Sequence, residues 1–116
     1  MGNFCRVTST CFTCTGETAT HIAAAEGQDI QLQCPGNETN SRVAWWKMDS
    51  YGNKRIVFNG AVQHDFADDM FFDKTSGILT IHKAKLNDSG MYYCSVGFDE
   101  AHEIHLSVLG KYQLQK

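Results

Sequence analysis

The residues in this sequence best suited to chemistry are its cysteines, which stand at positions 5, 11, 14, 34 and 94. Cys11 and Cys14 have the Cys-X-X-Cys spacing that is found in zinc sites and in redox pairs. The sequence offers no second pair of ligands for a structural zinc ion, and no alternation of strands and helices surrounds the motif. We therefore expect neither a metal site nor redox chemistry here. Five cysteines in 116 residues instead favour an oxidising compartment.

Cys5, Cys11 and Cys14 lie close together near the start of the sequence. We expect two of them to form a local disulfide, with the third either free or paired with another chain. The sequence does not select the pair. A further interpretation is that this segment derives from a vector or from alternative splicing.

The remaining residue types that serve catalysis form no recognisable arrangement. The sequence lacks a nucleophile elbow, a glycine loop that cradles phosphate, and a metal-binding pair of histidines. Its five histidines are scattered, and although His102 and His105 lie near each other in the sequence, exposed surface histidines are the default interpretation. We predict that the protein is not an enzyme and that it uses no cofactor.

The composition predicts one folded domain. Of the 116 residues, 42% are hydrophobic and 20% are charged, which is ordinary for a globular protein. The formal net charge is -3 and no run of Lys or Arg exceeds two residues, so the basic surface of a nucleic-acid or anionic-membrane binder is missing. No apolar stretch approaches the roughly 20 residues that cross a bilayer. Attachment to a membrane would therefore need a segment outside this sequence.

From residue 28 onward the sequence consists of short stretches in which apolar and polar residues alternate, separated by Gly, Asn, Asp or Ser. This pattern indicates an all-β fold, and a spacing of about ten residues is typical of a sandwich or a barrel. The expected strands are 29–34, 42–48, 54–58, 70–73, 78–82, 91–96 and 103–108. Residues before about 20 show no clean alternation, and we interpret them as an arm that leads into the first strand.

Alternation also assigns side chains to the core, because neighbours on a strand point to opposite faces of the sheet. Four sets of side chains share inward faces and would pack on one another. They are Ile30, Leu32 and Cys34; Val43 and Trp45; Tyr92, Cys94 and Val96; and Ile104, Leu106 and Val108. Cys34 and Cys94, 60 residues apart, thus both lie on inward faces.

Several short motifs lie in or near these expected strands. They are Cys34, Val43-Ala44-Trp45, Leu79-Thr80-Ile81 and Asp88-Ser89-Gly90-Met91-Tyr92-Tyr93-Cys94. Together they resemble the immunoglobulin superfamily over residues 20–110. The resemblance implies a two-sheet Greek-key sandwich, a disulfide between Cys34 and Cys94, a core tryptophan at Trp45, and a tyrosine corner at Tyr92. Room for a shortened extra edge strand in residues 59–69 favours the V-set type.

The sequence departs from the family pattern at two places, and the first restricts the group of proteins that it resembles. The Phe-Gly-X-Gly-Thr segment that ends antigen-receptor variable domains is replaced by residues 103–108. The chain is therefore similar to germline-encoded leukocyte receptors, such as the novel immune-type receptors and the T-cell coreceptor V domains. The family usually places at position 69 an Arg that bridges to the position of Asp88, but this sequence has Asp69 there. Asp88 must find another partner or remain solvated.

The resemblance implies three parts: an arm with extra cysteines (1–18), the V-set domain (19–110) and the stub of a stalk (111–116). We expect the extracellular face of the plasma membrane, with the domain belonging to a type I membrane protein whose leader and anchor lie outside this sequence. The Asn-X-Ser/Thr sequons at Asn37 and Asn87 are candidate glycosylation sites and agree with that location.

Trp46 would point outward from its sheet because it follows the core residue Trp45. Met48 shares its face, and the register of the family adds Tyr93 and Phe58. Contiguous exposed apolar side chains usually mark an interface, and in this family the face binds counter-receptors or a second V domain. The alternative is that Trp46 and Phe58 are covered by their own loops.

The loop of residues 97–102 is short and acidic. Phe98 would anchor a partner while Asp99 and Glu100 attract a basic one, and a solvated turn is the alternative.

The strand of Cys94 lacks the outward Arg of sialic-acid-binding V domains, which disfavours a lectin. We expect the ectodomain of an immune receptor that binds a protein ligand or counter-receptor. The alternative is a homophilic module in which two V domains pair as a dimer.

Overall fold

The alternating stretches of the sequence form strands in the computed structural model, which describes residues 4–7, 11–15, 19–34, 42–49, 52–97 and 101–110. In chain order the strands are β1 (Phe4–Val7), β2 (Cys11–Thr15), β3 (Ala19–Ala25), β4 (Ile30–Leu32), β5 (Val43–Asp49), β6 (Gly52–Phe58), β7 (Ala61–Val62), β8 (Met70–Phe72), β9 (Leu79–Ile81), β10 (Gly90–Val96) and β11 (His102–Leu109). Two short 3-10 helices, η1 (His64–Phe66) and η2 (Leu86–Asp88), lie between strands.

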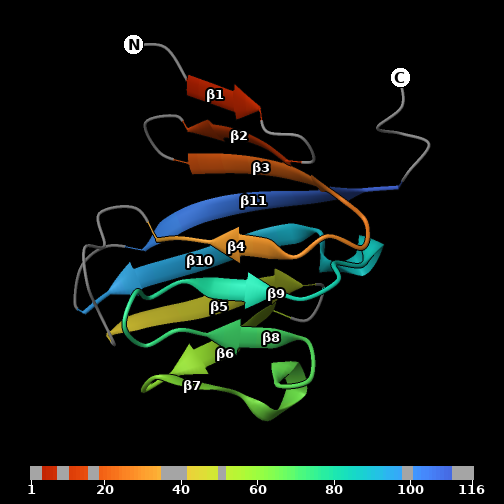
Figure 1. Ribbon diagram of the computed structural model, residues 1–116. Helices are drawn as coiled ribbons and strands as arrows, with labels where there is room; N and C mark the ends of the chain where they lie inside the picture. The colour runs from red at the N-terminus through yellow and green to blue at the C-terminus, as the bar shows by residue number, and fades with distance from the viewer. Residues whose placement is uncertain are drawn as a thin grey trace.

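The strands build two sheets that face each other (Figure 1). The larger sheet has the order β1-β2-β3-β11-β10-β5-β6-β7, and the smaller has the order β4-β9-β8. Pairing is antiparallel throughout the described strands except between β3 and β11, which run parallel from the pair Glu103 and Ala19 to the pair Leu109 and Ala25. The all-β sandwich is confirmed, and β7 is the short edge strand for which residues 59–69 left room.

The larger sheet also takes in the segment before residue 18. β1 pairs antiparallel with β2, and β2 pairs antiparallel with β3 (Figure 1). Alternation gives no sign of these two strands, because a strand added to a sheet edge gains backbone hydrogen bonds without needing an apolar face. The division of the chain at residue 18 stays a prediction.

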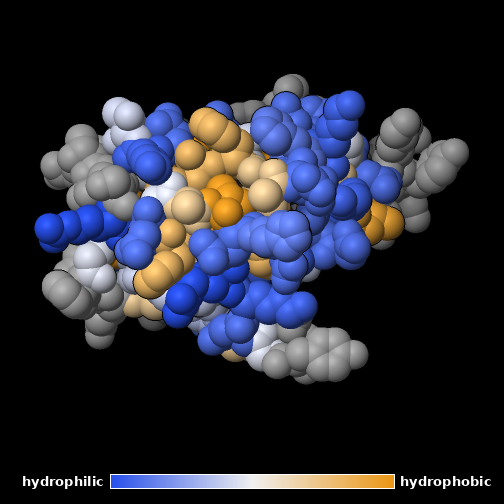
Figure 2. Space-filling model, turned by 90° about the horizontal axis from the view of Figure 1, so that it is seen from below, coloured by the Kyte–Doolittle hydropathy of each residue, from blue (hydrophilic) through white to orange (hydrophobic). Residues whose placement is uncertain are grey.

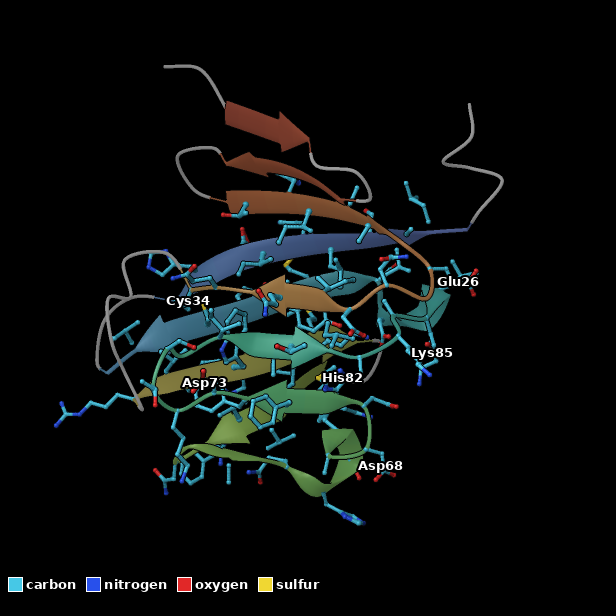
Figure 3. The ribbon with its side chains drawn as sticks, in the orientation of Figure 1. Glu26, Cys34, Asp68, Asp73, His82 and Lys85 are labelled. Atoms are coloured by element: carbon cyan, nitrogen blue, oxygen red, sulfur yellow. A yellow bond between two sulfur atoms is a disulfide. The ribbon has the colours of Figure 1, made fainter. Side chains whose placement is uncertain are left out.

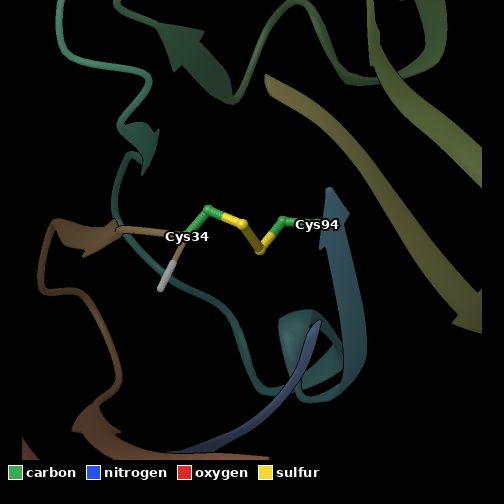
Figure 4. The surroundings of a disulfide bond; sticks show 2 residues. All are labelled: Cys34 and Cys94. Carbon is green, nitrogen blue, oxygen red and sulfur yellow. A yellow bond between two sulfur atoms is a disulfide. The ribbon is translucent and has the colours of Figure 1, made fainter. Parts of the chain in front are cut away.

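The inward-facing side chains predicted from alternation form the core between the sheets. Trp45, Leu32 and Tyr92 are completely buried, and Val96 is partly buried against the same cluster. The disulfide between Cys34 and Cys94 is confirmed; it joins the chain just after β4 to β10 across the two sheets, with a Cα–Cα distance of 5.8 Å (Figure 4).

One irregularity in the larger sheet departs from strict alternation. The register between β5 and β6 shifts between Trp45 and Trp46, which is the mark of a β-bulge. As a result the neighbours Ile56 and Val57 on β6 are both completely buried. The shift also decides which residue of β6 lies beside Trp46 on the outer face.

Candidate functional site

The pleat of β5 turns two neighbouring tryptophans to opposite sides of the larger sheet. Trp45 is completely buried, whereas Trp46 is partly exposed on the outer face. Trp46 lies opposite Tyr93 of β10 on one side and opposite Arg55 of β6 on the other. Tyr93 in turn lies opposite Glu103 of β11. Because directly opposed residues share a face, Arg55, Trp46, Tyr93 and Glu103 form a row across four strands, here called the cross-strand row.

An open hollow of about 500 Å³ lies beside the cross-strand row. Its lining consists of Trp46, Met48, Asn53, Arg55, Tyr93 and Ala101. Met48 is 40% exposed, so this hollow presents accessible apolar surface. Three of the four residues predicted for the outer face therefore meet at one place.

Phe58, the fourth predicted residue, faces a different hollow. It lines that hollow together with Ala44 and Gly60. The Arg55 guanidinium lies 4.3 Å from the centroid of the Phe58 ring, yet Phe58 remains 44% exposed. Phe58 is thus partly covered by Arg55 of its own strand, and Arg55 also lines the hollow of the other three residues.

The ring of Tyr93 is held in place from within the same strand. Its hydroxyl donates to the Sδ atom of Met91 over 2.8 Å. Met91 in turn lies opposite Met48 across β5 and β10. A fixed aromatic ring beside flexible methionine side chains gives a surface with both a rigid and an adaptable part.

A histidine pair on the same sheet could not be found from the sequence. His21 of β3 and His105 of β11 are register partners, and their rings stack with centroids 4.7 Å apart. The Nε2 atom of His105 lies 3.9 Å from a carboxylate oxygen of Glu103. Spacing along the chain pairs His105 with His102 instead, because the parallel register that brings His21 alongside is a long-range property of the fold.

At one end of the sandwich, Tyr92 and Asp88 fix the start of β10. The Tyr92 hydroxyl donates to the Asp88 backbone carbonyl over 2.6 Å, which is the arrangement of a tyrosine corner. Burial raises the pKa of the Tyr92 phenol far above its ordinary value, and the nearby Asp88 carboxylate raises it further.

The structure also supplies the partner that Asp88 needs. Its Oδ2 atom accepts from the backbone amide of Lys85 over 2.8 Å, so Asp88 caps η2. The Lys85 ammonium donates to Asp69 over 3.1 Å, and this hydrogen bond raises the pKa of Lys85. Figure 3 shows Lys85 and His82 on the chain that leads from β9 to η2. A carboxylate at position 69 thus pairs with Lys85, while Asp88 bonds to backbone.

A further apolar area lies on the edge of the sandwich that carries β7, where hydrophilic side chains surround it (Figure 2). Val62 of β7 and Phe66 of η1 are partly buried and pack against the core. These two side chains are an extension of the core toward the edge, and neither lines the hollow beside the cross-strand row.

Some predicted residues lie outside the part of the chain that the structure describes. They are Phe98, Asp99 and Glu100 of the acidic loop and Asn37 of the first sequon. Asn87 of the second sequon is exposed in η2, and its backbone carbonyl accepts from the Lys47 ammonium over 2.9 Å. Glycosylation at Asn37 and Asn87 stays a prediction.

The described residues hold neither a candidate metal site nor a candidate membrane-spanning helix. No three His, Cys, Asp or Glu side chains among them are grouped as metal ligands would be. No helix in this part of the chain has the length and apolar character needed to cross a membrane.

Comparison with known families gives a match over most of the sequence. Residues 17–109 match the immunoglobulin V-set domain. Curated proteins give no match.

Solved structures share the fold at low sequence identity. The first Ig-like domain of human CD48 antigen aligns with a TM-score of 0.68 and 21% identity, covering 84% of this chain and 88% of that one. The first Ig domain of the mouse polymeric immunoglobulin receptor aligns with a TM-score of 0.60 and 16% identity, covering 89% and 96%. The CD2-binding domain of CD58 aligns with a TM-score of 0.55 and 18% identity over 76% of this chain, which spans about half (52%) of that structure's length.

Proposed function

This chain belongs to the immunoglobulin V-set family, and on that premise we propose that it is the ligand-binding domain of a cell-surface receptor. It would recognise a protein partner through the outer face of β5, β6, β10 and β11. The observation that carries the proposal is the meeting of Trp46, Met48 and Tyr93 around one open hollow. Phe98, Asp99 and Glu100 of the acidic loop would extend the contact.

The composition of this face suits recognition of a protein. Wide aromatic rings contribute much contact area and lose little conformational entropy on binding, and Trp, Tyr and Arg dominate binding energies at interfaces. Arg55 and Glu103 stand at the two ends of the cross-strand row. Charges at the rim of an apolar centre orient a partner more than they strengthen its binding.

The structural neighbours support this class of function by analogy of fold. One of them is a domain of CD58 that binds CD2. Fold alone does not transfer a function, so the partner of this chain must be identified from its own surface. The same analogy supports an extracellular location.

Substitution of Trp46 by Ala tests the proposal. The isolated domain, displayed as a tetramer, is screened against a panel of cell-surface ectodomains, and every ectodomain bound is retested with Trp46→Ala. We expect binding to weaken by about 30-fold or more, since truncation of a central tryptophan removes at least about 2 kcal/mol.

Phe71→Ala is the matched control, because Phe71 is an exposed aromatic (57%) on β8 of the other sheet. It should bind as the unmodified domain does. Equal binding by Trp46→Ala and the unmodified domain would exclude this face as the site.

The alternative function is homophilic pairing of two such domains through the same face. The cross-strand row favours it, because its two ends carry opposite charges. A two-fold axis that lies in the interface and crosses the middle of the row at right angles would set Arg55 of one copy against Glu103 of the other. Light scattering of the purified domain distinguishes the two functions. A stable dimer supports homophilic pairing, and a monomer supports recognition of a different protein.

A further inference from the structure

Two of the N-terminal cysteines are brought together by the pairing of β1 with β2. In this antiparallel pair Cys5 is the direct register partner of Cys14. We propose that Cys5 and Cys14 form a second disulfide, which closes the β1–β2 hairpin, and that Cys11 remains a thiol. This inference does not depend on the proposed function.

The backbone geometry of an antiparallel pair fits this bond. Directly opposed residues have Cα atoms about 4.5 to 5.5 Å apart, depending on whether the pair is hydrogen-bonded. Disulfides span Cα distances of about 4.4 to 6.8 Å. The register position of Cys5 and Cys14 therefore satisfies the distance requirement without any backbone movement.

The same geometry excludes the two competing pairs. Cys11 and Cys14 lie three positions apart on one strand, which separates their Cα atoms by about 10 Å. Cys14 is the register position opposite Cys5, so Cys11 is also three positions away from the point opposite Cys5. Both separations exceed the limit of about 7 Å beyond which two cysteines are not bridged.

The remaining cysteines leave no other partner for Cys11 within the chain. Cys34 and Cys94 are already joined to each other. Cys11 itself is the register partner of Ala24, a buried residue of β3. We therefore expect one free thiol per chain, at Cys11.

Formation of the bond is an ordinary thiol–disulfide exchange with an external disulfide such as oxidised glutathione. One cysteine attacks as the thiolate, forms a mixed disulfide and releases one reduced glutathione. The second cysteine then attacks the protein sulfur of the mixed disulfide and releases a second reduced glutathione. The two cysteines lose two electrons and two protons, which the two glutathione thiols carry away.

The test is a disulfide map of the full chain refolded in a glutathione redox buffer. Free thiols are blocked with N-ethylmaleimide at mildly acidic pH, where few thiolates are present to exchange partners. Cleavage after Arg6, Phe12 and Glu17 then places each N-terminal cysteine in a separate peptide. The peptides are identified by mass spectrometry before and after reduction.

We expect a reducible link between the peptides that hold Cys5 and Cys14, and one maleimide on the peptide of residues 7–12. The link between Cys34 and Cys94 is the internal control, because its presence proves that the buffer was oxidising. Any link to Cys11, or maleimide on all three N-terminal cysteines while the control link is intact, would overturn the proposal.

The variant Cys11→Ser tests whether Cys5 and Cys14 pair because of their register and without any part played by Cys11. It should keep the link between Cys5 and Cys14 and take up no maleimide, because the remaining cysteines are then all paired. Loss of that link in the variant would show that Cys11 takes part in the bond, and the proposal would fail.

Discussion

The Tyr92 hydroxyl and the Asp88 backbone carbonyl are joined by a 2.6 Å hydrogen bond, and both residues are buried. Asp88 also closes η2, since its carboxylate accepts from the backbone amide of Lys85. One residue thus connects the helical turn to β10 through its backbone and caps the turn through its side chain. The stability of this end of the sandwich should therefore depend on both groups of Asp88.

Tyr92→Phe should lower the free energy of unfolding by about 1 to 3 kcal/mol, because the Asp88 carbonyl would stay buried without a donor. Urea denaturation followed by tryptophan fluorescence measures the change. Tyr93→Phe is the control: it also removes one hydroxyl, but from a partly exposed ring whose acceptor is the sulfur of Met91. Equal losses in the two variants would contradict the assigned role of the corner.

The corner also predicts an alkaline loss of stability. Burial raises the pKa of Tyr92 in the folded chain above the value of 10.0 for an exposed tyrosine. Above that pH the unfolded chain releases the phenolic proton while the folded chain keeps it, so the free energy of unfolding falls as pH rises. One such group contributes a slope of about 1.4 kcal/mol per pH unit. Denaturation measured from about pH 9 to about pH 11, on either side of the ordinary tyrosine pKa, should show a shallower decline for Tyr92→Phe, and parallel curves would refute the assignment.

Asp88→Ala should lower the free energy of unfolding by about 0.5 to 2 kcal/mol, the range for loss of a helix cap. Asp69→Ala removes a carboxylate from the same end of the fold, but its ion pair with Lys85 is about half exposed and should matter little. Thermal denaturation of both variants makes the comparison. A larger loss for Asp69→Ala would mean that the ion pair, and not the cap, holds this end.

The homophilic alternative predicts a charge-reversal rescue. In that arrangement Arg55→Glu and Glu103→Arg should each lower the dimer fraction, because each sets like charges against one another across the two-fold axis. The double variant restores opposite charges and should recover the dimer. Sedimentation velocity at low salt gives the dimer fraction, and failure of the double variant to recover would rule out this pairing geometry.

The core can be predicted from the sequence because burial in a sandwich follows the two-residue period of the strands. That period alone assigns Trp45, Cys34 and Leu106 to the core, and all three are buried. It also places Trp46 on the outer face, since a residue that follows a core position points away from it.

Features that depend on pairing between distant strands could not be predicted. The bulge at Trp45 and Trp46 buries both Ile56 and Val57, and no local pattern marks it. The stacking of His21 on His105 follows from a parallel register between strands at opposite ends of the chain. β1 and β2 show no alternation of apolar residues, because each joins the sheet through backbone pairing with its neighbouring strand.

The parallel pairing of β3 with β11 bears on how the fold would resist mechanical load. The start of β3, at Ala19, and the end of β11, at Leu109, lie at opposite ends of this strand pair. Tension that pulls these two points apart acts along the strands, so it loads all the hydrogen bonds between them at the same moment. An antiparallel hairpin pulled from its open end would instead lose its bonds one after another. Separation of this strand pair by such tension therefore requires its hydrogen bonds to break together.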